Sequence, residues 1–406
     1  MRGEPAWAEP ANGRAVPTAY HDRSRSPAET VAIMRPHFAE LGITRVARQT
    51  GLDCVGIPCY AAFRPNSCSI ASNQGKGIDD DAARASAVME AVEYAIAERP
   101  MVPQVVGSWA ALEAAGHALV SPCKALPVGE ALDPQRTIRW VHGRRLSDRR
   151  DVLVPLDLVA LSGDTRDLPG ICQNTNGLAS GNNAAEAIFH GACELIERDG
   201  NTLWSLMSRA EKAARCLRVE SFDEDIVTDL VHRLEATGLA VRLFDQTTDL
   251  GVPTVLAVTA PLDGVEVKHF DVAAGAGTHP SPARAALRAI TEAAQTRVTS
   301  IAGARDDIRP DSYRLAGSRE AFELLATAPT ADAPQVEVAE RSTAEALLER
   351  LLLQLQRHGI DDLIAVPLGG ERYGVSVVHV LSDALEDRGP NANWRPGRRA
   401  LTALLG

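Results

Sequence analysis

The chain has 406 residues, and with 45% of them hydrophobic it can bury one large core or two to three smaller ones. Its 42 basic and 53 acidic residues leave a formal net charge of −11, which argues against general binding of nucleic acids or anionic membranes. No apolar run approaches the roughly 20 residues of a membrane span, and the first residues lack a secretory core, so we expect a cytoplasmic protein.

Residues 1–25 are rich in Pro, Gly and Arg without periodicity, which predicts a flexible N-terminal arm. A single folded domain is expected over residues 26–406. It opens with a helix, because Ser26, Pro27 and Glu29 form a capping box with proline at the first helical position. Apolar patterns predict strands at 43–50, 54–64, 137–146, 151–161, 239–248, 252–261, 361–368 and 375–381.

Further helices follow from local signals. Residues 108–115 begin with a serine cap, and residues 222–238 form an amphipathic helix. The polar stretch 300–342 is expected to be a peripheral excursion. After it, Ser342 and Glu345 have capping-box spacing and open a leucine-rich helix, which we assign to the core.

A helix over residues 81–98 follows a strand that runs into Gly75, Lys76 and Gly77. A lysine between glycines before a helix suits a phosphate, because glycine allows close backbone approach and the helix N-terminus favours anions. The stretch is not a P-loop, and a turn with a surface lysine is the simple alternative. One face of this helix carries Ser86, Glu90 and Glu93.

A second helix, over residues 184–199, follows a glycine- and asparagine-rich loop at 174–183. Asn182 lies about one turn before this helix's first glutamate, where its amide either caps the helix or contacts a ligand. Cys193 is most simply a small core residue. Apolar residues fill most of the circumference, which predicts a helix buried on nearly all sides. The polar face consists of Glu186, His190, Glu194 and Glu197.

A third helix of the same kind is predicted over residues 283–297, after a glycine-rich stretch at 273–282. Aligned on the acidic residue, the three helices share a polar residue, then Glu four positions on, then Glu or Gln three positions further. The equivalent residues are Ser86, Glu90 and Glu93; His190, Glu194 and Glu197; and Arg288, Glu292 and Gln295. This repetition predicts three equivalent helices that face a common polar centre.

Glutamates three residues apart are often ordinary surface charges, which is the simple interpretation of any one helix. Buried together, however, several carboxylates are costly unless cations lie among them. Carboxylate oxygens suit Mg²⁺, which binds one or two of them while the phosphates of a nucleotide complete its coordination. The seven cysteines contain no CxxC pair, which argues against zinc.

These residues resemble the YcaO family of ATP-dependent enzymes, which phosphorylate a peptide-backbone amide oxygen. The resemblance extends over most of the chain, from about residue 40 to about residue 400, and residues 48–65 followed by NQGKG look like the family's opening. The motifs are SxxxExxE at Ser86, Glu90 and Glu93, NxxxE and ExxER at Asn182, Glu186, Glu194, Glu197 and Arg198, and RAxxExxQxR at Arg288, Glu292, Gln295 and Arg297.

The resemblance implies an α+β fold with pseudo-repeated strand/helix subdomains around a central nucleotide cavity, often as a homodimer. It implies ATP and Mg²⁺ as cofactors and no protein nucleophile, because phosphoryl transfer depends on positioning and electrostatics. The implied nucleotide-binding residues are Lys76, Ser86, Glu90, Asn182, Glu186, Arg198 and Arg288. The implied metal ligands are Glu90, Glu93, Glu186, Glu194 and Glu197, and the third motif adds Glu292, Gln295 and Arg297.

The C-terminus bears on the expected product, although the sequence leaves thioamide, azoline and amidine open. Azoline-forming members typically end in a proline-rich tail, whereas this chain ends in RPGRRALTALLG and looks more like the subgroup that works with a TfuA partner. That subgroup implies thioamide formation on a peptide or protein substrate, in the biosynthesis of ribosomal peptide products. The alternatives are an azoline- or amidine-forming cyclodehydratase, a non-catalytic nucleotide-binding scaffold and, last, a carboxylate-bridged metal enzyme without a nucleotide.

Overall fold

The computed structural model describes residues 22–161, 166–262, 268–303, 305–306, 308–336, 342–389 and 393–405. The chain divides into two compact units. Unit 1 draws on residues 1–37, 92–195 and 339–395, and unit 2 on residues 38–91, 196–338 and 396–406. Helices α2 (Asp80–Glu98) and α4 (Ala184–Leu206) contribute residues to both units. Residues 1–21 of the expected arm lie outside the described residues, and the single domain over 26–406 stays a prediction.

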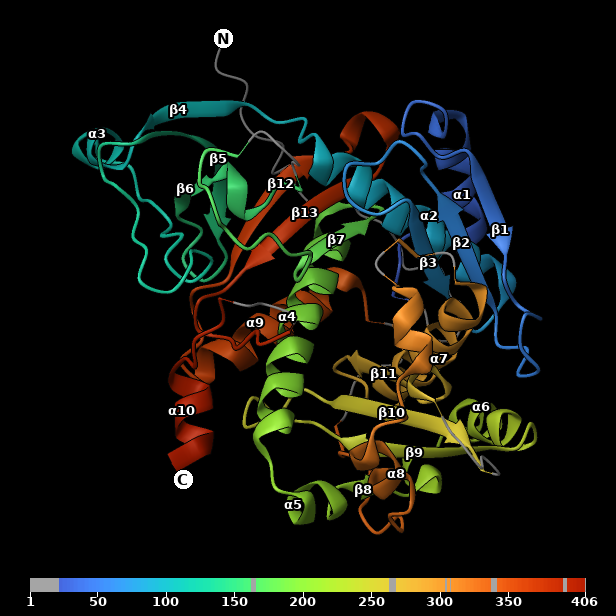
Figure 1. The fold of residues 1–406 in the computed structure, drawn as a ribbon. Helices are drawn as coiled ribbons and strands as arrows, with labels where there is room; N and C mark the ends of the chain where they lie inside the picture. The colour runs from blue at the N-terminus through green and yellow to red at the C-terminus, as the bar shows by residue number, and fades with distance from the viewer. Residues whose placement is uncertain are drawn as a thin grey trace. The chain divides into compact units, whose positions relative to one another are not determined.

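Unit 1 is built on an antiparallel sheet with the strand order β4-β5-β12-β13-β7, to which β6 is added by pairing with β5 (Figure 1). Its strands are β4 (Gln104–Ser108), β5 (Thr137–Arg145), β6 (Asp151–Pro155), β7 (Leu178–Gly181), β12 (Ile364–Gly369) and β13 (Ser376–Leu381). Its helices are α1 (Pro27–Met34), α3 (Trp109–Ala114) and α9 (Ala344–Arg357), with short 3-10 helices η1 (Arg35–His37), η2 (Leu156–Leu158) and η6 (Glu371–Tyr373).

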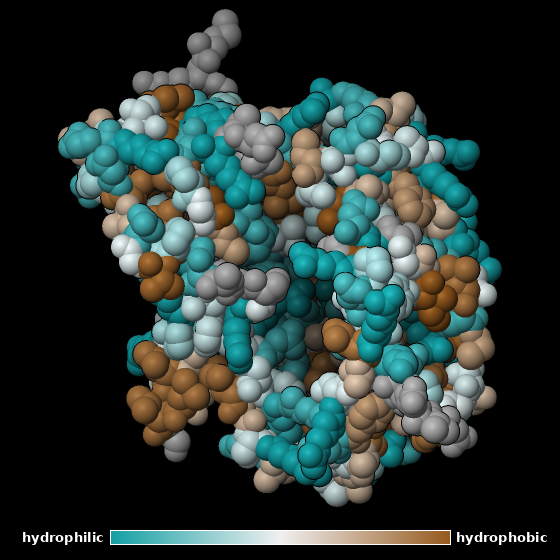
Figure 2. Space-filling view, viewed as in Figure 1, coloured by the Kyte–Doolittle hydropathy of each residue, from teal (hydrophilic) through white to brown (hydrophobic). Residues whose placement is uncertain are grey.

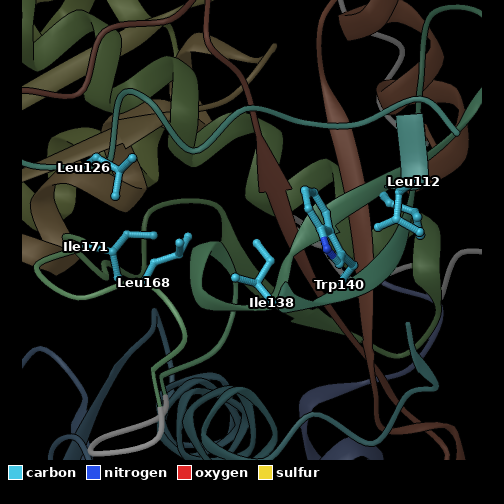
Figure 3. Close-up of a cluster of buried hydrophobic side chains, with 7 residues drawn as sticks. Leu112, Leu126, Ile138, Trp140, Leu168 and Ile171 are labelled. Carbon is cyan, nitrogen blue, oxygen red and sulfur yellow. The ribbon is translucent and has the colours of Figure 1, made fainter. Parts of the chain in front are cut away.

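One buried cluster of unit 1 gathers around Trp140, which is fully buried on β5 (Figure 3). The indole Nε1 of Trp140 donates to the carbonyl of Gly107 at 3.0 Å, so the polar end of this large side chain is satisfied. Trp109 packs against the same ring with 6.0 Å between ring centroids. The remaining buried members are Leu112, Leu126, Ile138, Leu153, Leu168 and Ile171.

Unit 2 contains two antiparallel sheets among its described residues, one with the order β1-β2-β3 and one with the order β11-β10-β9-β8. The strands are β1 (Arg45–Arg48), β2 (Cys59–Phe63), β3 (Ser72–Lys76), β8 (Cys216–Leu217), β9 (Leu239–Asp245), β10 (Thr254–Pro261) and β11 (Ala273–Thr278). The helices are α5 (Arg209–Ala213), α6 (Asp225–Glu235), α7 (Pro282–Ala302), α8 (Arg319–Leu325) and α10 (Arg398–Leu405), with η3 (Val219–Phe222), η4 (His269–Asp271) and η5 (Pro310–Arg314).

Each helix with an acidic face is preceded by a strand that contains glycine: β3 before α2, β7 before α4 and β11 before α7. At these glycines the helix backbone lies so close to the strand that no side chain would fit between them. A Cβ on Gly75 would lie 2.1 Å from the backbone nitrogen of Ala87, and a Cβ on Gly275 would lie 2.3 Å from that of Ala293. Glycine therefore lets the helix backbone rest directly on the strand.

The spacing of the glycines matches the helix. Gly277 lies against the turn that contains Ala285 and Ala289, and Gly275 lies against the next turn. Two strand residues advance about 6.6 Å and four helical residues about 6 Å, so glycines two apart meet successive turns. The expectation that 174–183 is a loop is wrong where β7 lies, because glycine normally indicates a turn and here serves packing. The glycine-rich stretch 273–282, for which no strand was predicted, likewise contains β11.

Several local predictions are confirmed or corrected. The capping box of Ser26 and Glu29 is present at α1. The strand expected over 151–161 ends at Pro155, and η2 follows it. The cap of α9 is Thr343 rather than Ser342, since the Thr343 side chain accepts from the backbone of Ala346. No helix among the described residues is long and apolar enough to cross a membrane.

The stretch 300–342 was expected to be peripheral, and part of it is not. Leu324 and Leu325 of α8 are buried in a cluster of unit 2. The other buried members of this cluster are Trp204, Cys216, Phe244, Val258 and Ala260. A short apolar helix inside a polar stretch carries too little periodicity to be recognised from sequence, although it completes this core.

The C-terminal helix α10 is held at its first turn by Arg399. This guanidinium donates to both oxygens of the fully buried Asp199 carboxylate, at 2.8 and 2.9 Å, and to Asp249. These two carboxylates keep Arg399 charged by raising its pKa against the opposing effect of burial. The far end of α10 exposes Leu401, Leu404 and Leu405, which coincide with an apolar patch in Figure 2.

The glycine contacts predict that Gly75→Ala destabilises the protein by more than about 3 kcal/mol, because backbone atoms rather than a mobile side chain have to give way. The matched control is Gly107→Ala, also in a strand, where the nearest atoms belong to the Leu112 side chain at 3.1 Å. We expect a loss below about 1 kcal/mol there. Chemical denaturation measures both, and equal losses would contradict the packing argument.

Candidate functional site

Unit 2 brings four of the expected site residues together, namely the carboxylate of Glu292 and three cationic side chains that act on it. Lys76, the last residue of β3, places its Nζ 2.7 Å from Oε2 of Glu292 on α7. Arg198, from the α4 residues of unit 2, and Arg288, one turn before Glu292, act electrostatically on the same carboxylate. The sequence placed these residues in three separate motifs, and the fold of unit 2 makes them neighbours.

The glycines of β11 determine how α7 presents this carboxylate. The Cβ of Arg288 lies 2.6 Å from the position of a Cβ on Gly277, and the Cβ of Glu292 lies 2.6 Å from that on Gly275. The Cβ atoms of Arg288 and Glu292 therefore lie where α7 rests on β11. Residues four apart share a helix face, so Arg288 and Glu292 project in similar directions.

The electrostatics of this cluster are dominated by its cations. Burial alone would raise the pKa of Glu292, but Lys76, followed by Arg198 and Arg288, holds it below the ordinary value. Glu292 is therefore ionised at neutral pH. Lys76, Arg198 and Arg288 all act on this one carboxylate, and Arg198 also lies 3.6 Å from Glu197. Cationic side chains of this kind suit phosphate oxygens.

Four further expected residues of unit 2 lie on α2 and α7. Ser86 and Glu90 of α2 and Gln295 of α7 belong to partly exposed faces of helices that are otherwise largely buried. Arg297 forms an ion pair with the buried Asp53, with 3.6 Å between Nε and Oδ2. Asp53 belongs to the stretch that looked like the family's opening, so Arg297 ties that stretch to α7.

In unit 1 two acidic residues hold the backbone near β7. Oε1 of Glu93 accepts hydrogen bonds from the backbone nitrogen and the hydroxyl of Ser180, at 2.8 and 2.7 Å. Oε2 of Glu194 accepts from the backbone nitrogen of Gly177 at 3.2 Å. Both glutamates are partly exposed.

Glu186 is the most enclosed of the acidic residues, with 1% of its side chain exposed. It accepts hydrogen bonds from the backbone and side chain of Asn182, at 2.9 and 3.0 Å. Asn183, rather than Asn182, caps α4, because its side chain accepts from the backbone nitrogen of Glu186. Further donors come from the N-terminal segment, namely the guanidinium of Arg23 and the backbone and hydroxyl of Ser24.

Glu197, also buried, lies 3.6 Å from the guanidinium of Arg198. Among the described residues, no three His, Cys, Asp or Glu side chains converge as metal ligands usually do. Mg²⁺ takes one or two carboxylates and relies on phosphates and water for the rest. The assignment of Glu90, Glu93, Glu186, Glu194 and Glu197 as its ligands stays a prediction.

Sequence reasoning missed three residues that contact the acids: Arg23, Ser24 and Ser180. Arg23 and Ser24 fall in the stretch assigned to the arm, where composition suggested no fixed structure. Ser180 falls in a stretch expected to be a loop, although its position two residues before Asn182 was a usable signal. Contacts between residues so far apart in the sequence leave no local pattern.

Comparisons with known proteins agree on one family. Residues 74–386 match the family model described as YcaO cyclodehydratase, ATP- and Mg²⁺-binding. An uncharacterized protein in the tfuA 3′ region of Rhizobium leguminosarum bv. trifolii is 38% identical over 399 residues, which covers 95% of this chain and 94% of that protein.

Solved structures show the same fold. YcaO from Methanopyrus kandleri, bound with AMPPCP and Mg²⁺, superimposes with a TM-score of 0.71 at 25% identity, covering 92% of this chain and 95% of that one. A heterocyclase in complex with substrate and cofactor gives a TM-score of 0.75 at 20% identity and 93% coverage of this chain. This chain spans 54% of that heterocyclase. The expected α+β YcaO-type fold is therefore confirmed, while the common polar centre stays a prediction.

The lowered pKa of Glu292 predicts a pH-dependent contribution to stability. The contribution is fully present above the pKa of the unfolded state, about 4.3, and is lost as pH falls through the lower folded value. Glu292→Gln should thus cost about 1 kcal/mol above pH 5 and progressively less below pH 4. Denaturation at a series of pH values measures this difference.

The control is Asp311→Asn, which removes the highly exposed partner of Arg314 and should change stability little at any pH. A cost of Glu292→Gln that persists undiminished at pH 3 would show that the carboxylate acts through packing rather than charge.

Proposed function

Because the chain belongs to the YcaO family, which binds ATP and Mg²⁺ and includes cyclodehydratases that act on peptides, we propose that it phosphorylates the oxygen of a peptide-backbone amide on the way to a thioamide. The observation that carries this proposal is the cluster of Lys76, Arg198 and Arg288 around Glu292. Such a cluster can bind a triphosphate and stabilise the charge that develops during phosphoryl transfer.

The residues divide between phosphate, nucleoside and metal. Lys76, Arg198 and Arg288 contact the phosphates, with Glu292 holding Lys76 in place at 2.7 Å. Ser86 and Asn182 contribute polar contacts to the nucleotide. Gln295 and Arg297 are the remaining polar residues of the third motif, on α7. Magnesium, when bound, neutralises phosphate charge and aligns the reacting groups. Its ligands are drawn from Glu90, Glu93, Glu186, Glu194 and Glu197.

The reaction needs no protein nucleophile. The amide oxygen attacks the γ-phosphorus, the bond from that phosphorus to the β-phosphate oxygen breaks, and ADP leaves. A sulfide then attacks the activated carbon, and the original amide oxygen departs as part of inorganic phosphate. The overall balance is amide, ATP and sulfide in, and thioamide, ADP and phosphate out. Lys76, Arg198 and Arg288 lower the barrier by positioning and charge.

Sulfur as the attacking group is supported by the likeness to the relative in the tfuA 3′ region. We infer a TfuA-like partner that assists sulfur delivery. The likeness in fold to a heterocyclase supports azoline formation as the second candidate.

The phosphate assignment predicts that Lys76→Ala weakens binding of ATP about tenfold or more while leaving adenosine nearly unchanged, because only ATP carries the triphosphate. Calorimetric titrations with Mg²⁺ present measure both affinities. The matched control is Lys268→Ala, which removes an exposed lysine of unit 2. Equal weakening of ATP and adenosine would instead assign Lys76 a structural role.

The product assignment predicts that a peptide co-expressed with this protein and a TfuA-like partner becomes heavier by the difference between sulfur and oxygen. Formation of an azoline would make the peptide lighter by one water and would require a neighbouring Cys, Ser or Thr. Intact-mass spectrometry separates the two results. A mass unchanged in the presence of ATP, sulfide and both proteins would favour a nucleotide-binding scaffold without catalysis.

A further inference from the structure

Strand β4 forms one edge of the sheet of unit 1, since among the described residues it pairs with β5 and with no other strand (Figure 1). At the opposite edge, side chains occupy the backbone of β7. The amide of Ser180 donates to Glu93 at 2.8 Å, and the carbonyl of Ser180 accepts from Arg23 at 3.4 Å. The two edges of one sheet are therefore treated differently, and the outer side of β4 is the open one.

The strand register shows which backbone groups of β4 face outward. In an antiparallel pair, two directly opposite residues either exchange both of their backbone hydrogen bonds or exchange none. Arg139 of β5 lies opposite Val106, and its amide donates to the carboxylate of Asp167 at 2.8 Å instead of to β4. The N–H and C=O of Val106 therefore point away from β5. Because the alternation repeats every two residues, the amides of Gln104 and Ser108 point the same way.

β4 lacks the residues that usually protect an open edge. Charged side chains or proline within an edge strand discourage pairing with another chain. The edge strand β1 of unit 2 carries Arg45 and Arg48, whereas β4 consists of Gln, Val, Val, Gly and Ser. Val106 is 67% exposed, so an apolar side chain lies beside the open backbone groups. An edge of this kind accepts a further strand.

The surroundings of this edge are basic although the chain as a whole is acidic. Residues 99–150, which include β4 and β5, contain 8 Lys and Arg and only 4 Asp and Glu, while the whole chain has a net charge of −11. Exposed arginines flank the strand. Arg99 lies shortly before it, and Arg136 is next to Thr137, which pairs with Ser108. The charge therefore favours an acidic partner.

We propose that β4 docks an acidic, extended segment of the peptide substrate, which adds to the sheet of unit 1 as a further strand. The inference rests on the proposed function, because it takes the partner to be the peptide that this reaction modifies. Backbone hydrogen bonds to Gln104 and Val106 provide affinity without fixing the sequence of the peptide, and the side chain of Val106 adds an apolar contact.

The docked segment is separate from the amide that reacts. β4 and β7 lie at opposite ends of the strand order, four strand spacings or about 19 Å apart. Glu93 and Glu194, which we assign to magnesium, contact the backbone near β7. The edge at β4 therefore serves recognition of the peptide and takes no part in phosphoryl transfer.

Val106→Pro tests the docking site, because proline removes an outward N–H without removing a hydrogen bond of the sheet. The probe is a fluorescent peptide of about ten residues in which glutamate and valine alternate, titrated without ATP. Val106→Pro should weaken its binding about tenfold or more. The matched control is Val128→Pro. Val128 is 70% exposed and follows Pro127 in a turn that the amide of Glu130 closes, where proline is favoured. This variant should bind as the unmodified chain does.

A second measurement uses the unmodified chain. The amide of Val106 should exchange rapidly with solvent in the free protein and slowly once the peptide is bound, whereas the amide of Val105, which faces β5, should be protected in both states. Unchanged exchange at Val106 would overturn the docking site, as would equal binding of the peptide by Val106→Pro or no binding by the unmodified chain.

The identity of the partner has its own controls. Equally tight binding of a peptide in which lysine and valine alternate would overturn the acidic partner. Self-association of the chain that Val106→Pro abolishes, measured by sedimentation, would overturn the peptide in favour of a second copy. Because these experiments contain no ATP, their outcome does not depend on catalysis. The proposed function fails separately, if neither ATP binding nor a mass change of a peptide is observed.

Discussion

The structure depends on backbone contact between glycine-bearing strands and the helices that follow them. At Gly75 and Gly275 a helix lies so close that a single methyl group would overlap backbone atoms. A helix that approaches a strand so closely buries nearly all of its circumference, and only a narrow face stays accessible. The polar residues of the helices are placed on this face, which explains how alanine-rich helices carry charged side chains.

The same contact fixes the direction of the charged side chains. Arg288 and Glu292 begin at the turns that touch Gly277 and Gly275, so they leave the helix from its most rigid part. A carboxylate with Lys76 at 2.7 Å and two arginines nearby is then ionised and held in place. Charged side chains held in place in this way would need little rearrangement to bind a phosphate, as the proposed function requires.

The acids of unit 1 show the opposite situation. The fold surrounds Glu186 with donors and leaves it almost no exposed surface, whereas Glu93 and Glu194 each accept from the backbone near β7 and stay partly exposed. A buried carboxylate without donors would be unstable, and Arg23, Ser24 and Asn182 supply the donors that Glu186 needs.

The sequence by itself determined the helices with acidic faces, their burial and the family, because helical periodicity and motif spacing are local properties. It also indicated Lys76 and Arg288 as phosphate contacts. It did not reveal β7 and β11, since glycine weakens strand propensity and only packing against a helix explains its presence there. Nor could it pair Lys76 with Glu292, Arg297 with Asp53 or Arg23 with Glu186. Those pairs join residues distant in the chain, and only the tertiary fold decides which charges meet.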